Sequence, residues 1–306
     1  MPNYVTHVVM GDSIEIPRTR VEIDRKLLSA FSMGQDLLVS KEGALSQTHN
    51  SKTRMFFYTL IKTIKEEKLY DNPDVLAYLY GHIMHYELDK VMHPYVYYMT
   101  NDIPKRGVVN FHMAMEEYLG DFFVKNRCSV KRNQLSSCAQ EILKINPSDD
   151  LGILINNLYY DTYGYFNALE ITKKTVRSIK LLEAFKTIMR EGKSGLYYKI
   201  IGLPNYLYLA DMDLKELTNS DKLTWRNPIT MRKQNSSVLE LFDLGLSLAQ
   251  EKIELINQVI YGNKSIAILD KIFQDESYDT GLICSIGKPF NKSRCLEKKL
   301  KQRTSF

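Results

Sequence analysis

Hydrophobic residues recur along this chain mostly at intervals of three and four, which is the spacing of one face of an α-helix. Strict alternation of apolar and polar residues, the pattern of a half-buried strand, covers few segments. Start signals support several helices: Asn50 or Ser51 can cap one, and Asp71-Asn72-Pro73-Asp74 opens the next. The spacing predicts an all-α protein with helices over about 21–33, 51–67, 74–93, 108–126, 133–144, 148–162, 165–190, 237–262 and 264–273.

Two later segments depart from the helical pattern. Residues 194–213, "SGLYYKIIGLPNYLYLADMD", are rich in aromatic side chains and contain Gly202 and Pro204. This segment is interpreted either as core packing or as a loop that enters a membrane or lines a substrate cleft. Residues 214–236 are polar and irregular, and they contain Trp225, the single tryptophan. We predict a long surface connection there and no domain boundary.

A chain of 306 residues that is 44% hydrophobic suits one large domain or two modest ones. Because no internal repeat or boundary is visible, we predict a single domain over residues 1–306, with a flexible tail at about 288–306. The formal net charge is a mild +5. Part of it lies in the tail, which is either a solvated chain end or a segment attracted to anionic lipid or nucleic acid. The basic residues of the tail are Lys292, Arg294, Lys298, Lys299, Lys301 and Arg303.

Targeting signals are not evident. No apolar run is long enough for a transmembrane helix, and the first residues lack the charged and apolar regions of a signal peptide. The four cysteines, Cys128, Cys138, Cys284 and Cys295, include no C-x-x-C pair and are predicted to be free thiols in a reducing compartment. These features favour the cytoplasm, and they leave non-classical export open.

The six histidines lie in the first 112 residues, together with carboxylates at helical spacing. His85 and Asp89 are four residues apart and share a helix face, as do His112 and Glu116 on a later helix. His93 lies four residues beyond Asp89. Pro94 follows it, so we expect that helix to end or bend near His93. The remaining histidines are His7, His49 and His82.

The two helices that carry these carboxylates are apolar on nearly every side, which is typical of buried helices. A buried carboxylate needs compensation, and no lysine or arginine lies three or four residues from Asp89 or Glu116. A divalent metal ion is the compensation that fits, because neutral imidazoles accompany the carboxylates. His82 is interpreted as a hydrogen-bonded core histidine or as a side chain that supports a ligand from behind.

These residues resemble the zinc-dependent phospholipase C family of bacteria. The resemblance covers roughly residues 4–126 strongly and the rest weakly. It rests on "H-x-x-x-D-x-x-x-H-P" at 85–94, "H-x-x-x-E" at 112–116, "M-G-Q-D" at 33–36, "S-Q-T-H-N-S-K-T-R" at 46–54, "Y-V-T-H" at 4–7 and, more weakly, "S-Y-D-T-G" at 277–281.

The resemblance implies an all-helical bundle with a buried di- or trinuclear zinc cluster in a cleft. It assigns one ion to Asp36, His49, His85 and Asp89. It assigns a second ion to His93, His112 and Glu116, and a third ion to His7, with Asp89 as a bridging ligand. In the secreted enzymes a free N-terminal amine also binds the third ion, whereas this chain begins Met1-Pro2, so we expect two to three zinc ions.

The implied reaction is hydrolysis of a phosphodiester, with Asp36 as the general base. Lys52 and Arg54 follow His49 closely and are interpreted as phosphate contacts or as a solvated helix start. A phospholipase C that releases diacylglycerol and makes peripheral contact with a membrane is the first hypothesis, favoured by a glutamate at position 116. A nuclease or nucleotide phosphodiesterase is the second, and a metal-stabilised interaction protein without catalysis is the third.

Overall fold

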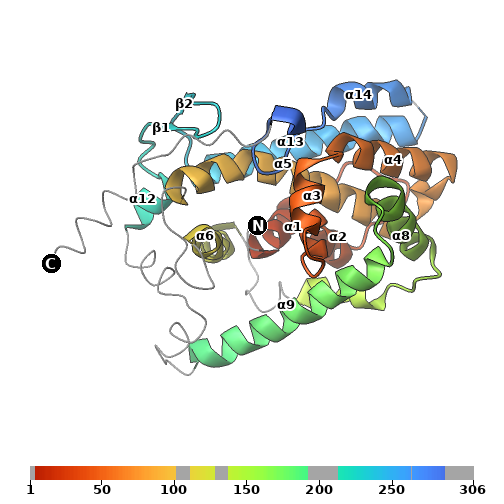
Figure 1. The fold of residues 1–306 in the computed structure, drawn as a ribbon, viewed down its shortest axis with the longest axis horizontal. Coiled ribbons are helices and arrows are strands. Elements are labelled where there is room, and N and C mark those ends of the chain that lie inside the picture. The colour runs from red at the N-terminus through yellow and green to blue at the C-terminus, as the bar shows by residue number, and fades with distance from the viewer. Residues whose placement is uncertain (1–3, 101–110, 128–136, 192–212, 263, 287–306) are drawn as a thin grey trace.

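A computed structural model describes residues 4–100, 111–127, 137–191, 213–262 and 264–286 (Figure 1). This part of the chain is mostly helical, which confirms the all-α prediction at the level of fold class. Its helices are α1 (Tyr4–Ser13), α2 (Arg25–Phe31), η1 (Gly34–Leu38), α3 (Ala44–Asn50), α4 (Thr53–Glu66), η2 (Leu69–Asp71), α5 (Pro73–Thr100), α6 (Phe111–Arg127), η3 (Ala139–Lys144), α8 (Asp150–Tyr163), α9 (Ala168–Glu191), α12 (Leu214–Thr218), α13 (Val238–Ile260), η4 (Ile266–Ile268), α14 (Leu269–Ile272) and η5 (Cys284–Ile286). A short antiparallel pair joins β1 (Trp225–Arg226) to β2 (Lys233–Gln234).

The long helix α5 lies at the centre of the packing. Every residue from 75 to 89 is buried, because α2 and α13 both pack against this helix (Figure 1). Glycines allow the close approach. A Cβ atom on Gly81 would lie 2.5 Å from the backbone of Phe31 in α2, and one on Gly245 of α13 would lie 3.2 Å from Leu88. A side chain placed on the middle of α5 is therefore removed from solvent on all sides.

Helix α5 does not end at His93, so the predicted end of the helix near that residue was wrong. The helix continues through Pro94 to Thr100. A proline removes one backbone hydrogen bond and crowds the preceding turn, at a cost of about 3 kcal/mol. Burial after the proline offsets this cost, since Tyr95 and Val96 are each 1% exposed and Tyr95 packs edge-on against Trp225.

The N-terminal helix α1 was not among the predicted helices. Its residues from Val5 to Gly11 are buried, and it packs against α2 and α6. Because every side is covered, its apolar residues show no single-faced periodicity. The next helix, α2, is shorter than predicted and begins at Arg25, because the Asp24 side chain accepts hydrogen bonds from the backbone N–H groups of Lys26 and Leu27.

The connection at 214–236 is only partly a surface segment. Trp225 is 3% exposed, lies against Tyr95 and Tyr98, and donates its indole N–H to the carbonyl of Ser236. After this connection, α13 begins with a capping box formed by Ser237 and Glu240. The polar composition of the segment concealed a buried tryptophan that holds it against the end of α5.

Some predictions fall outside the described residues. They concern the aromatic segment up to residue 212, the basic tail at 288–306, the first three residues, and the thiols Cys128 and Cys295. Cys284 is a free thiol, as predicted. Within the described ranges, each helix is too short or too polar to cross a membrane.

Candidate metal centre

Three groups of buried imidazoles and carboxylates come together among α1, η1, α3, α5 and α6. Within each group, one potential ligand atom from every member lies within 4.8 Å of the others. The groups are His7, His85 and Asp89; Asp36, His49 and His85; and His93, His112 and Glu116. All eight residues predicted to bind metal belong to these groups, and within one group residues as far apart in the sequence as His7 and Asp89 meet in the fold, 82 positions apart (89 minus 7).

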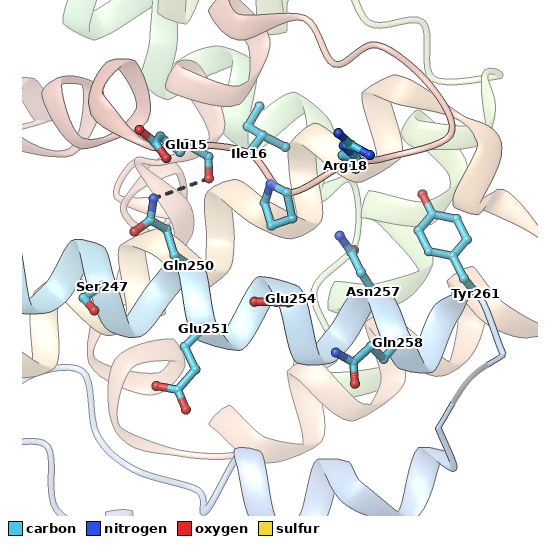
Figure 2. Close-up of a pocket in the computed structure, with 11 residues that line it drawn as sticks. Glu15, Ile16, Arg18, Ser247, Gln250, Glu251, Glu254, Asn257, Gln258 and Tyr261 are labelled. Atoms are coloured by element: carbon cyan, nitrogen blue, oxygen red, sulfur yellow. Dashed lines mark hydrogen bonds between the residues drawn. The ribbon is translucent and has the colours of Figure 1, made fainter.

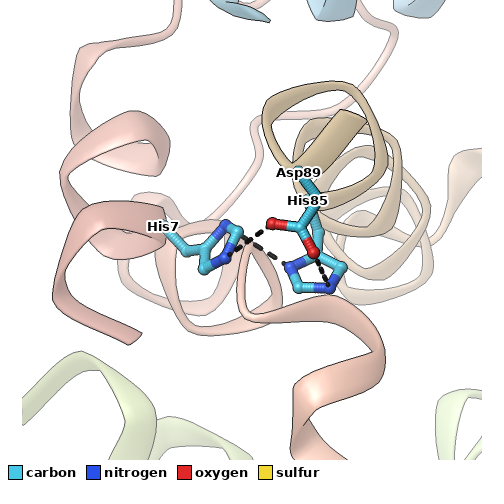
Figure 3. Close-up of side chains that lie close together, drawn as sticks. All are labelled: His7, His85 and Asp89. Atoms are coloured by element: carbon cyan, nitrogen blue, oxygen red, sulfur yellow. Dashed lines mark hydrogen bonds and ion pairs between the residues drawn. The ribbon is translucent and has the colours of Figure 1, made fainter. Parts of the chain in front are cut away.

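Asp89 is the common neighbour of four imidazoles. Its Oδ1 lies 3.2 Å from His7 Nε2, and its Oδ2 lies 3.4 Å from His85 Nε2 (Figure 3). Oδ2 also lies 3.7 Å from His49 Nε2 and 4.0 Å from His93 Nδ1. Burial raises the pKa of the Asp89 carboxyl, but His85, His93 and His7 outweigh burial and hold the pKa below its usual range. This direction favours the ionised carboxylate, which is the form that could bind a metal ion.

The short helix η1 places Asp36 beside His49, with 3.2 Å between Asp36 Oδ1 and His49 Nε2. Gly34 makes this arrangement possible. Its φ of +48° lies in the left-handed region, and a Cβ atom there would come within 2.5 Å of the His85 ring. The "M-G-Q-D" segment thus needs glycine for two reasons, backbone conformation and the space that His85 occupies.

The third group lies closest to solvent, because the His112 side chain is 18% exposed whereas that of Glu116 is 2% exposed. Glu116 Oε1 lies 2.7 Å from His112 Nε2 and 3.7 Å from His93 Nε2. Burial lowers the pKa of His93, but Asp89 and Glu116 outweigh it and raise that pKa to about 9. Burial also lowers the pKa of His112. Glu116 keeps a depressed pKa because His112 and His93 overcome its burial.

The polar atoms of the first two groups fit bound metal ions. The Nε2 atoms of His7, His49 and His85, and both carboxylate oxygens of Asp36 and Asp89, are buried and make no hydrogen bond to any described residue. Leaving buried polar atoms unpaired costs roughly 1–3 kcal/mol each, and native interiors contain few of them. Imidazole nitrogens with carboxylate oxygens are ligands for divalent metal ions, so these groups could hold a metal.

His82 lies outside the three groups. Its Nδ1 lies 2.9 Å from the carbonyl oxygen of Tyr78, its Nε2 lies 3.4 Å from the Tyr159 hydroxyl, and Phe56 covers its ring. Burial lowers its pKa to about 4. These contacts are those of a neutral, hydrogen-bonded core histidine. The Tyr159 hydroxyl donates to Gln35, the neighbour of Asp36. His82 is therefore connected to the candidate centre only indirectly, through Tyr159 and Gln35.

Glu87 is another buried carboxylate in the middle of α5, but lysines compensate it. Its Oε1 lies 2.5 Å from Lys252 Nζ of α13, and its Oε2 lies 3.3 Å from Lys90 Nζ. Lys90 also pairs with Glu276 at 2.6 Å. Burial lowers the pKa of Lys252. Helix α5 thus carries an ion-pair cluster toward α13, separate from the histidine groups.

Lys52 and Arg54, predicted as phosphate contacts or as part of a solvated helix start, have partners within the protein. Lys52 Nζ donates to the carbonyl of Thr162 at 2.7 Å. Arg54 pairs with Asp270 at 2.6 Å, and both side chains are about half exposed. These contacts favour the second interpretation.

A surface groove of about 770 Å³ lies between residues 15–18 and α13 (Figure 2). Its lining mixes carboxylates and amides with Arg18 and Tyr261, and Gln250 donates to the carbonyl of Glu15 at 3.5 Å. None of the eight candidate metal ligands lines this groove. We therefore keep it separate from the candidate centre.

The segment 277–279 contacts the candidate ligands, and sequence reasoning assigned it no role. The Tyr278 carbonyl lies 3.0 Å from His93 Nδ1, and the Tyr278 N–H donates to the carbonyl of His49 at 3.0 Å. Asp279 Oδ1 lies 3.8 Å from His93 Nδ1. More than 180 residues separate this segment from His93, so no helical spacing pointed to the contact.

No protein-family model, curated protein or solved structure matches this chain. Eight imidazole and carboxylate side chains form three groups, two of which share His85, and each group could hold a metal ion.

Proposed function

We propose that this protein is a zinc-dependent phosphodiester hydrolase that cleaves phospholipids as a phospholipase C does. The observation that carries the proposal is the convergence of the three ligand groups around Asp89. Neighbouring metal positions that share a carboxylate are typical of sites that hydrolyse phosphate esters. The resemblance to the bacterial enzymes, which named the same eight residues, supports the choice of reaction.

Each ion would have its own set of protein ligands. Asp36, His49 and His85 would hold one ion together with Asp89, and His7 would join Asp89 at another position. His93, His112 and Glu116 would hold the remaining ion. When bound, zinc would supply Lewis acidity and neutralise the negative charge that develops during in-line displacement at phosphorus.

Asp36 is the candidate general base. Its Oδ1 faces His49 at 3.2 Å, and neither of its carboxylate oxygens hydrogen-bonds to a described residue, so Oδ2 can take the proton of the attacking water. Asp89 and Glu116 lie against the candidate imidazole ligands and help to fix their positions. The protein thereby contributes chiefly positioning and charge, which account for most catalysis of phosphoryl transfer.

The choice of lipid over nucleotide rests on two features near the outer group. The family resemblance associates a glutamate at position 116 with the phospholipases and an aspartate with the nucleases. The Tyr97 ring lies 4.8 Å from the His112 ring, so an aromatic surface borders the most exposed ligand. Such a surface can contact an acyl chain or a quaternary ammonium head group.

The deciding experiment measures metal and products together. Purified protein is freed of metal, reloaded with zinc, and assayed by mass spectrometry for bound zinc. The release of a phosphorylated head group from phosphatidylcholine vesicles, and of nucleotide from a dinucleotide, is then measured. We expect two to three zinc ions per chain and release of a phosphorylated head group.

The other outcomes would change the assignment. Zinc with cleavage of the dinucleotide alone would indicate a nuclease, and zinc without either activity would indicate a metal-stabilised interaction protein. Failure to retain zinc after reloading would refute the metal centre. The matched controls are His85→Ala, which removes a candidate ligand, and His82→Ala, which removes a buried histidine of the same helix.

A further inference from the structure

The segment 275–281 is held firmly at its start by residues that lie outside the ligand groups. Asp275 Oδ1 accepts hydrogen bonds from the Thr53 hydroxyl and the Arg54 N–H, both at 3.2 Å. The Thr53 hydroxyl also donates to the carbonyl of Glu276 at 2.9 Å, and Glu276 pairs with Lys90 at 2.6 Å. The chain therefore enters the interior beside α4 and α5 at a defined place.

The middle of this segment lies against three candidate ligands. The Tyr278 ring is 4.9 Å from the His49 ring and 5.4 Å from the His85 ring, and the side chain is fully buried. Its main chain contacts His49 through the N–H and His93 through the carbonyl, each at 3.0 Å. A single residue thus contacts candidate ligands that together belong to all three groups.

Asp279 is fixed in position by its own network. The Asn50 side chain donates to Asp279 Oδ2 at 2.8 Å, and the Tyr97 hydroxyl donates to Oδ1 at 3.4 Å. The Ser277 hydroxyl donates to Asn50 at 2.7 Å and accepts from the Asp279 N–H at 3.1 Å. These contacts keep Oδ1 at 3.8 Å from His93 Nδ1, on the same side of the ring as the Tyr278 carbonyl.

The two ring nitrogens of His93 therefore face different partners. A carbonyl oxygen can only accept a hydrogen bond, so Nδ1 must carry the proton that it donates to Tyr278. Nε2 lies 3.7 Å from Glu116 Oε1 on the side of the third group, and with a metal ion bound there it would supply its lone pair to that ion. A histidine ligand commonly donates its second nitrogen to a carbonyl or carboxylate, which sets the tautomer and orients the ring.

We propose that Tyr278 and Asp279 are positioning residues for His93: the Tyr278 carbonyl accepts the Nδ1–H, and the Asp279 carboxylate beside it favours that proton and aims Nε2 at the metal position. This inference deepens the proposed function, on whose metal centre it rests. It assigns a role to a segment of the chain that contributes no ligand to the three groups.

The test compares Asp279→Asn with Asp275→Asn, the same substitution in the same segment. Asp275 contacts Thr53 and Arg54 instead of a histidine, so Asp275→Asn controls for a general loss of packing of the segment 275–281. Zinc retained against increasing chelator is measured by mass spectrometry. In Asp279→Asn we expect one zinc equivalent to bind about ten- to a hundredfold more weakly, the usual effect of losing such a support, and in Asp275→Asn we expect wild-type binding.

A second measurement does not depend on zinc. The His93 Nδ1–H is followed by NMR of protein labelled with ¹⁵N-histidine, with and without metal, and is assigned by its absence in His93→Gln. We expect a hydrogen-bonded signal in the wild type that shifts and exchanges faster in Asp279→Asn. An unchanged signal, or unchanged zinc affinity, in a folded Asp279→Asn protein would overturn the inference.

The design separates this inference from the proposed function. If wild-type protein retains zinc but hydrolyses nothing, the proposed function fails while the zinc and NMR comparisons still decide the role of Asp279. If Asp279→Asn fails to fold, Ser277→Ala replaces it, because it loosens the Asp279 network and leaves the carboxylate in place. We expect Ser277→Ala to lose zinc affinity in the same direction but to a smaller extent than Asp279→Asn. Wild-type zinc affinity and a wild-type NMR signal in Ser277→Ala would equally overturn the inference.

Discussion

At the scale of single residues, the candidate centre shows how local contacts distinguish two buried side chains of the same type. His85 and His82 lie three positions apart on α5 and are both buried. His85 faces Asp89 and the imidazole of His7, whereas His82 is enclosed by Tyr78 and Phe56 and satisfied by a backbone carbonyl. The surroundings of each ring, more than its identity, separate a ligand from a core residue.

Substitution of these two histidines is expected to have different consequences. His85→Ala would remove a ligand common to two groups, so we expect loss of at least one zinc ion together with stability. His82→Ala would leave a cavity, with a destabilisation of about 2–4 kcal/mol but the full zinc content. Zinc analysis and urea unfolding check both variants. Loss of zinc in His82→Ala with retention in His85→Ala would contradict the assignment.

Gly34 provides a second prediction at this scale. In Gly34→Ala the new methyl group would meet the His85 ring at about 2.5 Å in a left-handed backbone conformation. We expect a loss of about 2–4 kcal/mol in unfolding free energy, together with weaker zinc binding, because His85 must move. Gly43→Ala is the control, since Gly43 also has positive φ but open space around its Cβ position. Equal zinc affinity in the two variants would refute the steric argument.

The buried neutral state of His82 predicts that the free energy of unfolding depends on pH. Burial lowers its pKa in the folded protein to about 4, below the 6.5 of the unfolded chain. As the pH falls, the histidine of the unfolded chain therefore becomes protonated before that of the folded protein. The contribution of His82 to stability is full above pH 6.5 and is lost as the pH drops from 6.5 to 4, by roughly 3 kcal/mol. His82→Gln should lack that part of the fall. Urea unfolding in chelator at pH 7.5 and 4.5 tests this, and parallel curves for both proteins would contradict it.

At the scale of elements, α5 organises two charged clusters with different chemistry. The turn around His85 and Asp89 contacts α1, η1 and α3, where the neighbours are imidazoles and a carboxylate. Glu87 instead contacts Lys90 and Lys252 toward α13. Because residues two apart on a helix point in different directions, one buried helix can serve a metal centre and an ion-pair cluster at once.

Single substitutions should affect the ion-pair cluster and the candidate metal centre independently. Glu87→Gln would leave Lys252 buried without its charged partner, so we expect a destabilisation of about 3 kcal/mol with unchanged zinc content. Asp89→Asn, a similar change two residues away, should release zinc. Thermal unfolding and mass spectrometry of both variants check this. If Glu87→Gln also loses zinc, the clusters are coupled through α5.

At the scale of the whole molecule, the centre connects elements distant in the chain. Its candidate ligands come from α1, η1, α3, α5 and α6, and the 277–279 segment contacts His49 and His93. An ion bound there favours the folded state alone, since the unfolded chain does not assemble the site. The metal centre is therefore expected to contribute to the stability of the entire fold.

Removal of metal tests this expectation. We expect chelator-treated protein to unfold at a lower temperature than zinc-loaded protein, and excess zinc to restore the difference. A hundredfold excess of free zinc over its dissociation constant corresponds to about 2.7 kcal/mol for one site. Differential scanning calorimetry with and without zinc provides the measurement, and His85→Ala should respond less than wild type. An identical transition with and without zinc would contradict the structural role.

The sequence by itself determined the class of fold, and it indicated the candidate ligands of α5 and α6, to which the family resemblance added His7, Asp36 and His49. Helical periodicity predicted most helices, and four-residue spacing placed His85 with Asp89 and His112 with Glu116 before any tertiary contact was known. Buried carboxylates without a nearby lysine or arginine then required compensation. These properties are local, because they follow from helix geometry and from the cost of burying charge.

The tertiary structure alone decided the features that depend on distant partners. The course of α5 through Pro94 depends on packing of the following turn, and the burial of Trp225 depends on Tyr95. Glu87 is compensated by Lys252, and His93 contacts Tyr278, in each case from more than 160 residues away. Such pairings leave no periodic signal, because they arise only when separate segments pack against each other.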